Sequence, residues 1–401
     1  SPSATIEGVV VDAEAMMRAR IERAGGRDGG APADQSSDTV APGVTLHGRD
    51  VRVTWGSVVL LDKAAGTLTP RLSLYGEDGE VSHDGQRWRA RIDRDLNHEA
   101  LAGEAHLELS CDGTLCEGSV SVDDPVSQHP LLAPRPVPLA RLRVDGTWSM
   151  DDGRFEAHAL IGPVQADLEG IVTANPLEGV IRIAVPDTLL EDVVRLFGAQ
   201  IPEAARSHIV GTVGLDAELR LPGLTWTATP RAQGLGAEGV ISDARELRDG
   251  TVEWRAAGAG EDDWTIKRTG RGQPHWTPIE SAGLVPAAIM AAEDASFYQH
   301  SGYDLGAMKA SLDEKAADPV STLRGGSTLS QQLAKNLFLD GRDRTLTRKL
   351  RELLYALDLE RILPKQRILE LYVNIVELGP HLHGIGAASE AYFLKVPERL
   401  T

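Results

Sequence analysis

The sequence is poor in cysteine, has no long apolar run and lacks an excess of basic residues. Only two of its 401 residues are cysteine, so it is not a small scaffold held together by disulfides. No apolar stretch approaches the roughly 18 residues that cross a bilayer, which excludes a bundle of membrane helices. Lys and Arg number 41 against 59 Asp and Glu, and the formal net charge of -18 argues against a general nucleic-acid binder.

The remaining composition is that of a globular protein with more than one domain. Hydrophobic residues make up 42% of the chain and charged residues 25%. At roughly 150 residues per domain, the length predicts two to three domains. The chain starts at Ser1 without an initiator Met and stops at Thr401, so we expect a piece of a longer polypeptide. A signal peptide or membrane anchor can then precede Ser1.

The two cysteines lie close together in the sequence. Cys111 and Cys116 bracket a turn-like Asp-Gly-Thr-Leu sequence, which can close a hairpin and bring the two sulfur atoms together. A disulfide and a pair of half-buried thiols are both compatible with this spacing. Two cysteines are too few for a zinc site. A disulfide would indicate an oxidising compartment.

A change of composition near residue 277 divides the chain. All 7 Trp residues and nearly all Asp-Gly dipeptides precede it. Around Asp152-Gly153, apolar residues alternate with polar ones from Leu142 to Ala159, which is typical of a β-meander. We therefore expect an antiparallel β-rich region over 1–260, a linker over 261–276 and a separate domain over 277–401. The β-rich region resembles AsmA-like envelope proteins in its pattern.

The β-rich region contains several expected subdivisions. Similar segments recur at Val144–Val172 and Val210–Val240 and predict two degenerate β-repeats, joined near 129–140. The other expected features are a helix at Ala13–Ala24, a Gly-rich linker at Gly25–Ser37, a Pro-rich joint at His129–Pro138 and a short helix at Thr188–Phe197.

The last 125 or so residues have a helical period. Five leucines between Leu346 and Leu357 fall on one face of an amphipathic helix, and Pro364 ends it and starts another. The acidic excess of the chain lies almost entirely before this region. We therefore expect a mainly α-helical domain over 277–401.

The first of four polar clusters in this domain follows an apolar helix at Leu284–Ala292. It contains Glu293, Asp294, Phe297 and His300. A carboxylate beside another acid and apolar groups is suited to act as a general base, because desolvation and like charge both favour holding a proton. A solvated helix end is the alternative interpretation.

The second cluster begins with Gly325 and Gly326 and continues as Ser-Thr-Leu-Ser-Gln-Gln. Paired glycines allow close backbone approach, and Thr328 and Gln331 have the spacing of a capping box at a helix start. Free N–H groups at that start can bind an anion such as pyrophosphate. An ordinary helix cap is the alternative, and the sequence is not a Walker P-loop.

The third cluster is basic, and the fourth is mostly apolar. Five basic residues lie between Arg342 and Arg351, with Arg348 and Glu352 on one helix face. Such a run is usually a solvated basic face. The fourth cluster, from Lys365 to Asn374, is a packing helix when considered alone.

Taken in order, the four clusters resemble the motifs of the peptidoglycan glycosyltransferases, glycosyltransferase family 51. Those motifs read ED-x-x-F-x-x-H-x-G, GGSTITQQ, RK-x-x-E and K-x-x-ILE-x-Y-x-N. The first, third and fourth match at every specified position, and the second departs only at Leu329 and Ser330. This form of the motifs is closer to that of the monofunctional enzymes than to that of the bifunctional penicillin-binding proteins. No transpeptidase motif is present.

The resemblance covers about residues 274–401 and implies a lysozyme-like helical fold that polymerises lipid II. It implies that Glu293 is the general base and that Asp294 and His300 support it. The acceptor 4-hydroxyl would attack C1 of the lipid-linked chain with inversion, and undecaprenyl pyrophosphate would leave. Glu352 would orient the cations or hold a divalent ion such as Mg²⁺; no metal-ligand cluster is legible. The substrate-binding residues carried over by match are Ser327, Gln331, Gln332, Lys335, Asn336, Arg344, Arg348 and Lys349.

The resemblance also sets expectations for partners and location. The partners would be lipid II, the growing glycan chain, a membrane surface and other cell-wall synthesis proteins, with no nucleic acid. The protein would work at the periplasmic face of the cytoplasmic membrane. The sequence ends before the family's fifth motif, so we expect part of the fold and of the acceptor site to lie outside it.

Two other functions remain open at this point. One is a non-catalytic envelope scaffold or lipid-handling protein that uses a glycosyltransferase-like domain only for binding; the presence of Glu293 and Glu352 argues against it. The other is a lysozyme-type glycan-cleaving enzyme, because both chemistries use carboxylates. A hydrolase does not need the basic run at 342–351 or an anion-binding loop.

Overall fold

The structure is a computed structural model of the chain, and it describes residues 3–12, 16, 45–55, 58–69, 71–98, 100–174, 177–257, 264–318 and 325–400. Apart from Met16, the helix predicted at Ala13–Ala24 and the linker predicted at Gly25–Ser37 lie outside these residues. The chain forms two compact units. Unit 1 comprises Ser1–Val126, Leu139–Ile183 and Leu219–Leu224, and unit 2 comprises Ser127–Pro138, Ala184–Glu218 and Thr225–Thr401.

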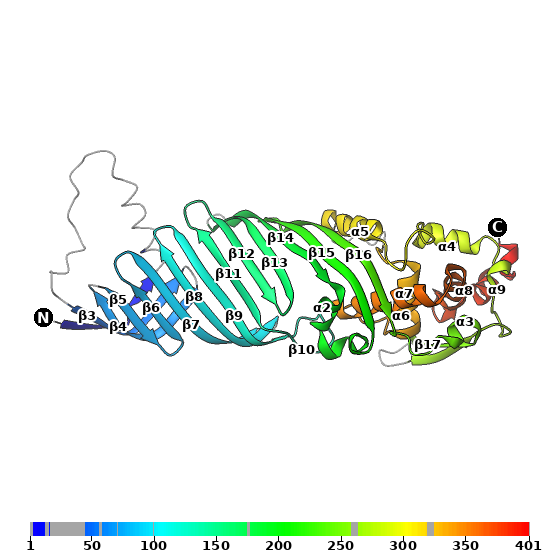
Figure 1. Cartoon of the computed structure of the whole chain (residues 1–401), viewed down its shortest axis with the longest axis horizontal. Helices are drawn as coiled ribbons and strands as arrows, with labels where there is room; N and C mark the ends of the chain where they lie inside the picture. Colours follow the sequence, from blue (N-terminus) through cyan, green and yellow to red (C-terminus); the bar gives the residue numbers. More distant parts are fainter. Residues whose placement is uncertain are drawn as a thin grey trace. The chain divides into compact units, whose positions relative to one another are not determined.

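Unit 1 is built from long neighbouring β-strands (Figure 1). In chain order these are β1 (Ser3–Glu7), β2 (Val10–Asp12), β3 (Thr45–Trp55), β4 (Val58–Thr69), β5 (Leu72–Gly76), β6 (Gly79–His83), β7 (Arg87–His98), β8 (Leu101–Asp112), β9 (Leu115–Ser127), β11 (Leu142–Ser149), β12 (Arg154–Ile161), β13 (Val164–Ala174) and the start of β14 (Leu177–Leu189). Strands β1 and β2 are parallel to β3, and the printed registers from β3 to β9 and from β11 to β13 are antiparallel.

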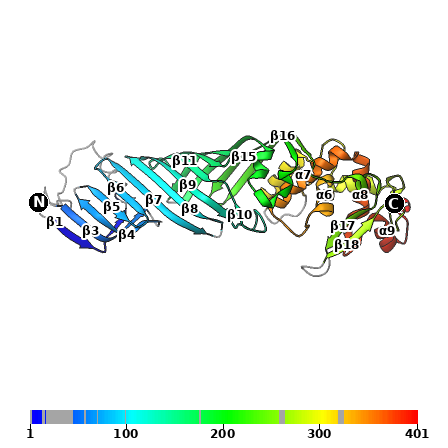
Figure 2. The same ribbon diagram turned by 60° about the horizontal axis from the view of Figure 1, so that its bottom comes forward.

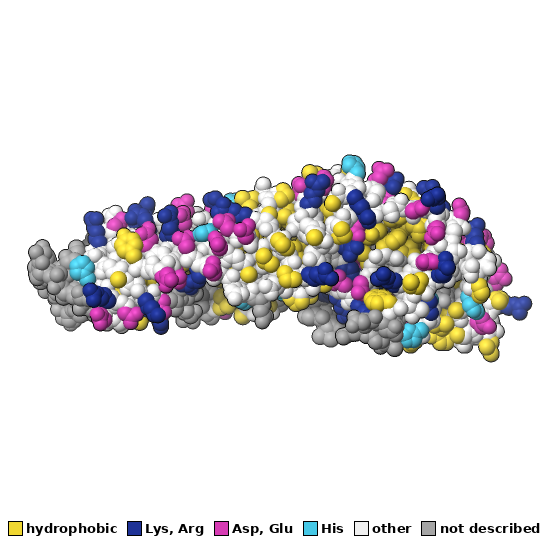
Figure 3. Space-filling view, turned by 90° about the horizontal axis from the view of Figure 1, so that it is seen from below, with side chains coloured by type: hydrophobic (Ala, Val, Ile, Leu, Met, Phe, Trp, Pro, Cys, Tyr) yellow, Lys and Arg dark blue, Asp and Glu magenta, His cyan; other side chains and the backbone are white. Residues whose placement is uncertain are grey.

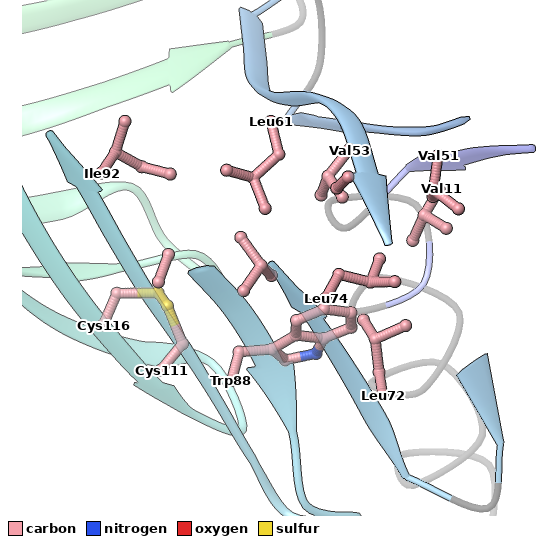
Figure 4. Packing of buried hydrophobic residues seen from close by; sticks show 13 residues of the cluster. Val11, Val51, Val53, Leu61, Leu72, Leu74, Trp88, Ile92, Cys111 and Cys116 are labelled. Atoms are coloured by element: carbon pink, nitrogen blue, oxygen red, sulfur yellow. A yellow bond between two sulfur atoms is a disulfide. The ribbon is translucent and has the colours of Figure 1, made fainter. Parts of the chain in front are cut away.

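The core of unit 1 follows from alternation along its strands. In β7, Trp88, Ala90 and Ile92 are buried while their neighbours are exposed. Successive side chains of a strand point to opposite faces, so this pattern places one face of β7 in the core. These residues pack with Leu61 and Leu74 of neighbouring strands, as Figure 4 shows. The predicted β-rich region is thereby confirmed as a large, mainly antiparallel sheet.

One local prediction is confirmed in unit 1, and one alternative left open by the sequence is decided. Strands β11 and β12 form the hairpin expected around Asp152-Gly153, with Trp148 opposite Phe155. Gly153 has a φ of 71°, a conformation that glycine adopts at little cost. Cys111 and Cys116 are cross-strand neighbours in β8 and β9 and form a disulfide.

The exposed surface of unit 1 is rich in ion pairs of both signs. Arg91 contacts Glu108 at 2.5 Å, and Arg94 contacts Asp78 at 2.7 Å. On the face shown in Figure 3, basic and acidic side chains are interspersed over this part of the chain. Exposed pairs of this kind contribute little stability individually, so burial on the other side of the strands is what stabilises the unit.

Unit 2 combines strands with most of the helices. Its elements are β10 (Val137–Pro138), α2 (Leu190–Arg195), η1 (Gly198–Gln200), η2 (Pro202–Ala205), most of β15 (His208–Leu221), β16 (Thr225–Glu238), α3 (Arg245–Asp249), β17 (Val252–Ala257), β18 (Trp264–Thr269), η3 (Ile279–Ser281), α4 (Val285–Glu293), α5 (Leu305–Ala317), α6 (Leu329–Phe338), α7 (Leu346–Ile362), α8 (Lys365–Ile375), β19 (Glu377–Gly379), β20 (Leu382–His383), α9 (Ile385–Phe393) and η4 (Pro397–Arg399).

Helices α6, α7 and α8 form the core of unit 2. Helix α6 packs against α7 and α8, while α5 and α7 also pack against β16 (Figure 2). Leu333, Leu354, Leu359 and Ile368 are fully buried among them. Burial of large aliphatic side chains is the main stabilising contribution to such a core.

Several expected elements of unit 2 are present. The leucine-rich helix is α7, and α8 starts after Pro364 as expected. Helix α2 falls within the predicted Thr188–Phe197 helix, and α4 matches the predicted apolar helix. The predicted linker over 261–276 contains a strand, β18, which pairs antiparallel with β17. Within the described residues, none of the helices is both long and apolar enough to span a bilayer.

Candidate active site

The first polar cluster lies at the end of α4. Glu293 is the last residue of the helix and is exposed, while the following Asp294 is 7% exposed. This differs from the expectation that apolar groups surround Glu293. The two adjacent carboxylates therefore have different environments, with Glu293 open to a reactant and Asp294 inside the fold.

Asp294 and His300 brace the loop that follows α4. The Gly302 N–H donates to His300 Nδ1 at 3.2 Å, so the other ring nitrogen carries the proton in the neutral imidazole. That nitrogen, Nε2, lies 3.0 Å from both Asp294 carboxylate oxygens. Asp294 also accepts a hydrogen bond from the Leu329 backbone N–H at 2.8 Å. Asp294 and His300 thus hold this loop against the start of α6.

The N-terminus of α6 is capped within the protein. Leu329 N–H donates to Asp294, and Gln331 N–H donates to the Thr328 hydroxyl at 3.2 Å. The Asp294 charge also lies at the positive end of the helix dipole. These two N–H groups are therefore already paired, and the expectation that the start of α6 offers free N–H groups to an anion is wrong for them.

A close approach explains the second glycine of the loop before α6. A Cβ atom at Gly326 would lie 2.9 Å from Met308 Cα and 3.1 Å from Ser311 Cβ, both in α5. Gly325 has open space at the same position. Gly326 therefore lets this loop lie against α5, which fixes where α6 begins.

Glu293 is held by a hydrogen-bonded chain from α6 and α8. Gln332 Nε2 donates to Glu293 Oε2 at 3.0 Å, and Tyr372 Oη donates to Gln332 Oε1 at 2.9 Å. Burial raises the pKa of Tyr372, and the nearby negative charge of Glu293 raises it further. Tyr372 therefore stays protonated at neutral pH and fixes the amide orientation in which Gln332 donates to Glu293.

The cationic cluster lies where α7 faces α6. Lys349 Nζ donates to Ser327 Oγ at 2.5 Å, to Glu352 Oε2 at 2.9 Å and to Gln331 Oε1 at 3.3 Å. Arg348 also pairs with Glu352, which is 3% exposed. Burial, followed by repulsion from Arg348 and Lys335, lowers the pKa of Lys349 to about 8. The structure thus brings Ser327, Gln331 and the RK-x-x-E residues together.

The other predicted binding residues lie beside this cluster. Burial lowers the pKa of Lys335, Arg348 lowers it further, and the charge of Glu293 opposes both. Lys335 and Asn336 line a cavity of about 210 Å³ together with Trp264. Arg344 is exposed in the turn before α7. Lys335 is therefore near enough to both Glu293 and Arg348 for their charges to shift its pKa, and Asn336 lines the same cavity as Lys335.

The residues of this site do not fit a protein-bound metal ion. Both carboxylate oxygens of Glu352 contact cations, Arg348 at Oε1 and Lys349 at Oε2. Among the residues that the structure describes, no group of three His, Cys, Asp or Glu side chains is placed to hold a metal ion. Glu352 therefore orients the two cations, and we derive no step through Mg²⁺.

The fourth cluster is mainly structural, with one exception. Asn374 Nδ2 donates to the Thr277 and Glu370 carbonyl oxygens, each at 2.8 Å, and this ties α8 to the start of the helical part. Tyr372 is the exception, because it reaches Gln332. The sequence predicted only a packing role for the helix that carries Tyr372, although the position of Tyr372 in the fourth motif was a signal of a role in the site.

Comparison with known proteins identifies relatives of the helical part of the chain. Residues 265–401 match the family model described as Transglycosylase, a match that begins inside the predicted linker. Similar proteins include biosynthetic peptidoglycan transglycosylases from Shewanella amazonensis, 45% identical over 127 residues, Nitrosospira multiformis, 45% over 119, and Acinetobacter baylyi, 47% over 116. These alignments cover 31%, 29% and 28% of this chain.

The chain spans about half the length of these relatives, with 51%, 51% and 50% of each covered. The aligned lengths correspond to the helical third of the chain rather than to the β-rich part. The four motifs, the family match and the aligned lengths of the relatives all indicate that the helical third of the chain is the part similar to these proteins. Residues 265–401 therefore match the Transglycosylase family and carry the four glycosyltransferase motifs described above.

Proposed function

We propose that the full-length protein polymerises lipid II into glycan strands. The observation that carries this proposal is the placement of one exposed carboxylate, Glu293, near a cluster of half-buried cations. Glu293 is oriented by Gln332, and Lys335 lies within electrostatic range of both Glu293 and Arg348. A base for a sugar hydroxyl and cations for a departing pyrophosphate are the two requirements of this transfer.

The proposed reaction is a single displacement. Glu293 takes the proton of the acceptor 4-hydroxyl while that oxygen forms a bond to C1 of the lipid-linked chain. The bond from C1 to the pyrophosphate oxygen breaks, and undecaprenyl pyrophosphate leaves with the electron pair. One displacement inverts the anomeric centre from α to β. A positioned general base of this kind contributes about 10²- to 10⁴-fold in rate.

The cations of α6 and α7 serve the leaving group. Lys335, Arg348 and Lys349 carry positive charge where burial makes that charge costly, and an incoming diphosphate would relieve this cost. Glu352 and Ser327 hold Lys349 in place. Preorganised charges of this kind stabilise a transition state more effectively than mobile solvent does.

The proposed setting is the outer face of the cytoplasmic membrane. The disulfide between Cys111 and Cys116 supports an oxidising compartment. Lipid II, the growing chain, the membrane surface and other cell-wall proteins are the proposed partners. The helical part is proposed to have the lysozyme-like arrangement implied by the motifs.

The test is polymerisation of lipid II by the full-length protein, with and without the phosphoglycolipid inhibitor moenomycin. We predict that Glu293→Gln abolishes glycan-chain synthesis, because the amide cannot accept the proton, while substrate binding is largely kept. The matched control is Glu280→Gln, an exposed glutamate in η3.

Unchanged synthesis by Glu293→Gln would contradict the assignment. If the wild-type protein instead shortened preformed peptidoglycan and ignored lipid II, the glycan-cleaving alternative would replace it. Binding of lipid II without polymerisation would favour the scaffold alternative.

A further inference from the structure

Helix α7 presents two neighbouring faces with different contacts. Arg348, Lys349 and Glu352 lie on the face that belongs to the proposed pyrophosphate site. Arg351 directly precedes Glu352, so its side chain projects about 100° away around the helix axis. Tyr355 lies one turn further on, next to Arg351. This second face contacts segments of unit 2 that precede the family match.

The main contact on the second face is a buried carboxylate. Glu203, in the short helix η2, is 1% exposed. Its two oxygens accept hydrogen bonds from Arg351, from Nε at 3.0 Å and from Nη2 at 2.6 Å. The Tyr355 hydroxyl donates to the same carboxylate at 3.0 Å. A planar guanidinium bound through two parallel hydrogen bonds allows little freedom of rotation or translation.

The carboxylate of Glu203 is ionised in this position. Burial opposes its ionisation, but the hydrogen bonds and positive charge of Arg351 outweigh burial, so its pKa lies below the ordinary value. An ion pair that is buried and fully hydrogen-bonded is disrupted at high cost when one partner is removed. Glu203 therefore fixes Arg351, and with it the middle of α7.

A second contact holds the start of α7. The Leu346 N–H donates to the Leu131 carbonyl oxygen at 2.8 Å, and the Thr347 N–H donates to that of Leu132 at 3.0 Å. Thr345 accepts from the next two N–H groups of the helix, through its hydroxyl and its carbonyl oxygen. The first four N–H groups of a helix need partners from outside it, and here half of them come from the Pro-rich segment.

A third contact holds the far half of the helix. The Ile241 N–H donates to Asp358 Oδ2 at 2.8 Å, and the Asp358 side chain is completely buried. Segments near residues 131, 203 and 241 thus contact α7 at its start, middle and far half. None of them belongs to the residues that match the transglycosylase family.

We propose that Glu203 is a positioning residue of the pyrophosphate site, acting through Arg351 on the helix that carries Arg348, Lys349 and Glu352. The proposal rests on the function proposed above for that site. It assigns part of the β-rich region a role in substrate binding. A displacement of about 1 Å in groups that position a substrate can cost on the order of 10²-fold in rate.

The test compares Glu203→Ala and Glu203→Gln in the full-length protein. We expect Glu203→Ala to raise KM for lipid II about ten- to a hundred-fold, because misplaced cations bind the pyrophosphate less well. Glu203→Gln keeps an acceptor oxygen and should fall between Ala and wild type. Loss of folded protein alone would lower kcat and leave KM unchanged, so the KM increase distinguishes positioning from general destabilisation.

Two controls make the result specific. Glu191→Gln removes a half-buried carboxylate of α2 that pairs with Arg195 in the same helix, and it should leave KM unchanged. The double variant Glu203→Ala with Arg351→Ala should show the same KM as Glu203→Ala alone, because residues that act as one unit are not additive. Additive effects of the two substitutions would contradict an action through Arg351.

A binding measurement separates this proposal from the function on which it rests. Affinity for farnesyl pyrophosphate, a soluble polyprenyl pyrophosphate, does not require catalysis. Weaker binding by Glu203→Ala would support the positioning role even if lipid II were not polymerised. Wild-type KM and wild-type affinity in a folded Glu203→Ala protein would overturn it.

Discussion

Lys349 connects the packing of the site with its chemistry. Its amine contacts Ser327, Gln331 and Glu352, and burial with two nearby cations lowers its pKa to about 8. The lysine is therefore protonated at neutral pH but close to losing its charge. A residue in this state responds to pH in the range where the enzyme works.

We predict that kcat/KM of the wild-type protein falls above pH 8, by about tenfold per pH unit, because the free enzyme loses the Lys349 charge that binds the pyrophosphate. Arginine keeps its charge throughout this range, so Lys349→Arg should move the decline to higher pH. Rate measurements between pH 6 and 10 check this. Lys309→Arg, at an exposed pair with Asp313, is the control and should keep the wild-type profile. An identical decline in Lys349→Arg would show that another group titrates.

A second prediction concerns Tyr372. Tyr372→Phe removes the hydroxyl that fixes Gln332 and leaves the ring in place, so Gln332 should hold Glu293 less firmly. A hydrogen bond contributes about 0.5–1.5 kcal/mol net, so we expect kcat to fall about 3- to 10-fold with little change in KM. Steady-state kinetics of lipid II polymerisation provide the measurement. An unchanged kcat would mean that Gln332 is held adequately by other contacts.

Single residues also show where sequence reasoning succeeds. The motif spacing predicted that Glu293, Lys349 and Glu352 belong to one site, because each motif places its polar residues at a helix end or on a helix face. At the start of α6, the capping spacing of Thr328 and Gln331 is confirmed, whereas the expectation of free N–H groups is wrong for Leu329 and Gln331. Asp294 comes from a segment distant in sequence, and only the fold shows that it accepts from Leu329.

At the scale of elements, the β8–β9 hairpin is the clearest case of local prediction. The turn between Cys111 and Cys116 places the two residues opposite each other in register. Both cysteines are also part of the core of unit 1, beside Trp88. The disulfide therefore joins strands that the turn already brings together.

Because the two cysteines are close in sequence, we expect their disulfide to make a modest contribution to stability. Replacing both cysteines by alanine should lower the free energy of unfolding of unit 1 by about 2 kcal/mol, since cross-linking a loop of this size removes little entropy from the unfolded chain. Denaturant unfolding with the disulfide verified by mass spectrometry is the measurement. The double alanine variant should keep a strand content equal to wild type. A loss above about 4 kcal/mol would mean that packing of the sulfur atoms matters more than the cross-link.

The boundaries of helices and strands show which local features can be predicted from the sequence. Pro364 marked the end of the leucine-rich helix, and in the structure α7 ends at Ile362 and α8 begins at Lys365. The strand β18 was missed because its six residues contain basic and polar side chains and resemble a linker. Its pairing with β17 depends on a partner, which periodicity in one segment does not reveal.

At the scale of the whole molecule, composition predicted a β-rich part followed by a helical part. It did not predict that segments near residues 131, 203 and 241 pack with the helices in one compact unit. Their contacts to α7 join residues far apart in sequence, such as Glu203 and Arg351. Periodicity and motif spacing describe local order, so contacts of this kind become visible only in the fold.

The cap on α7 bears on how this protein can be divided for study. A version cut at the start of the family match would lose the Leu131 and Leu132 carbonyl oxygens and would leave two helix N–H groups without their partners. It would also leave Arg351 and Tyr355 without Glu203, and buried polar groups without partners favour unfolding or association. We therefore expect a stably folded fragment to begin before Leu131, well before the residues that match the family.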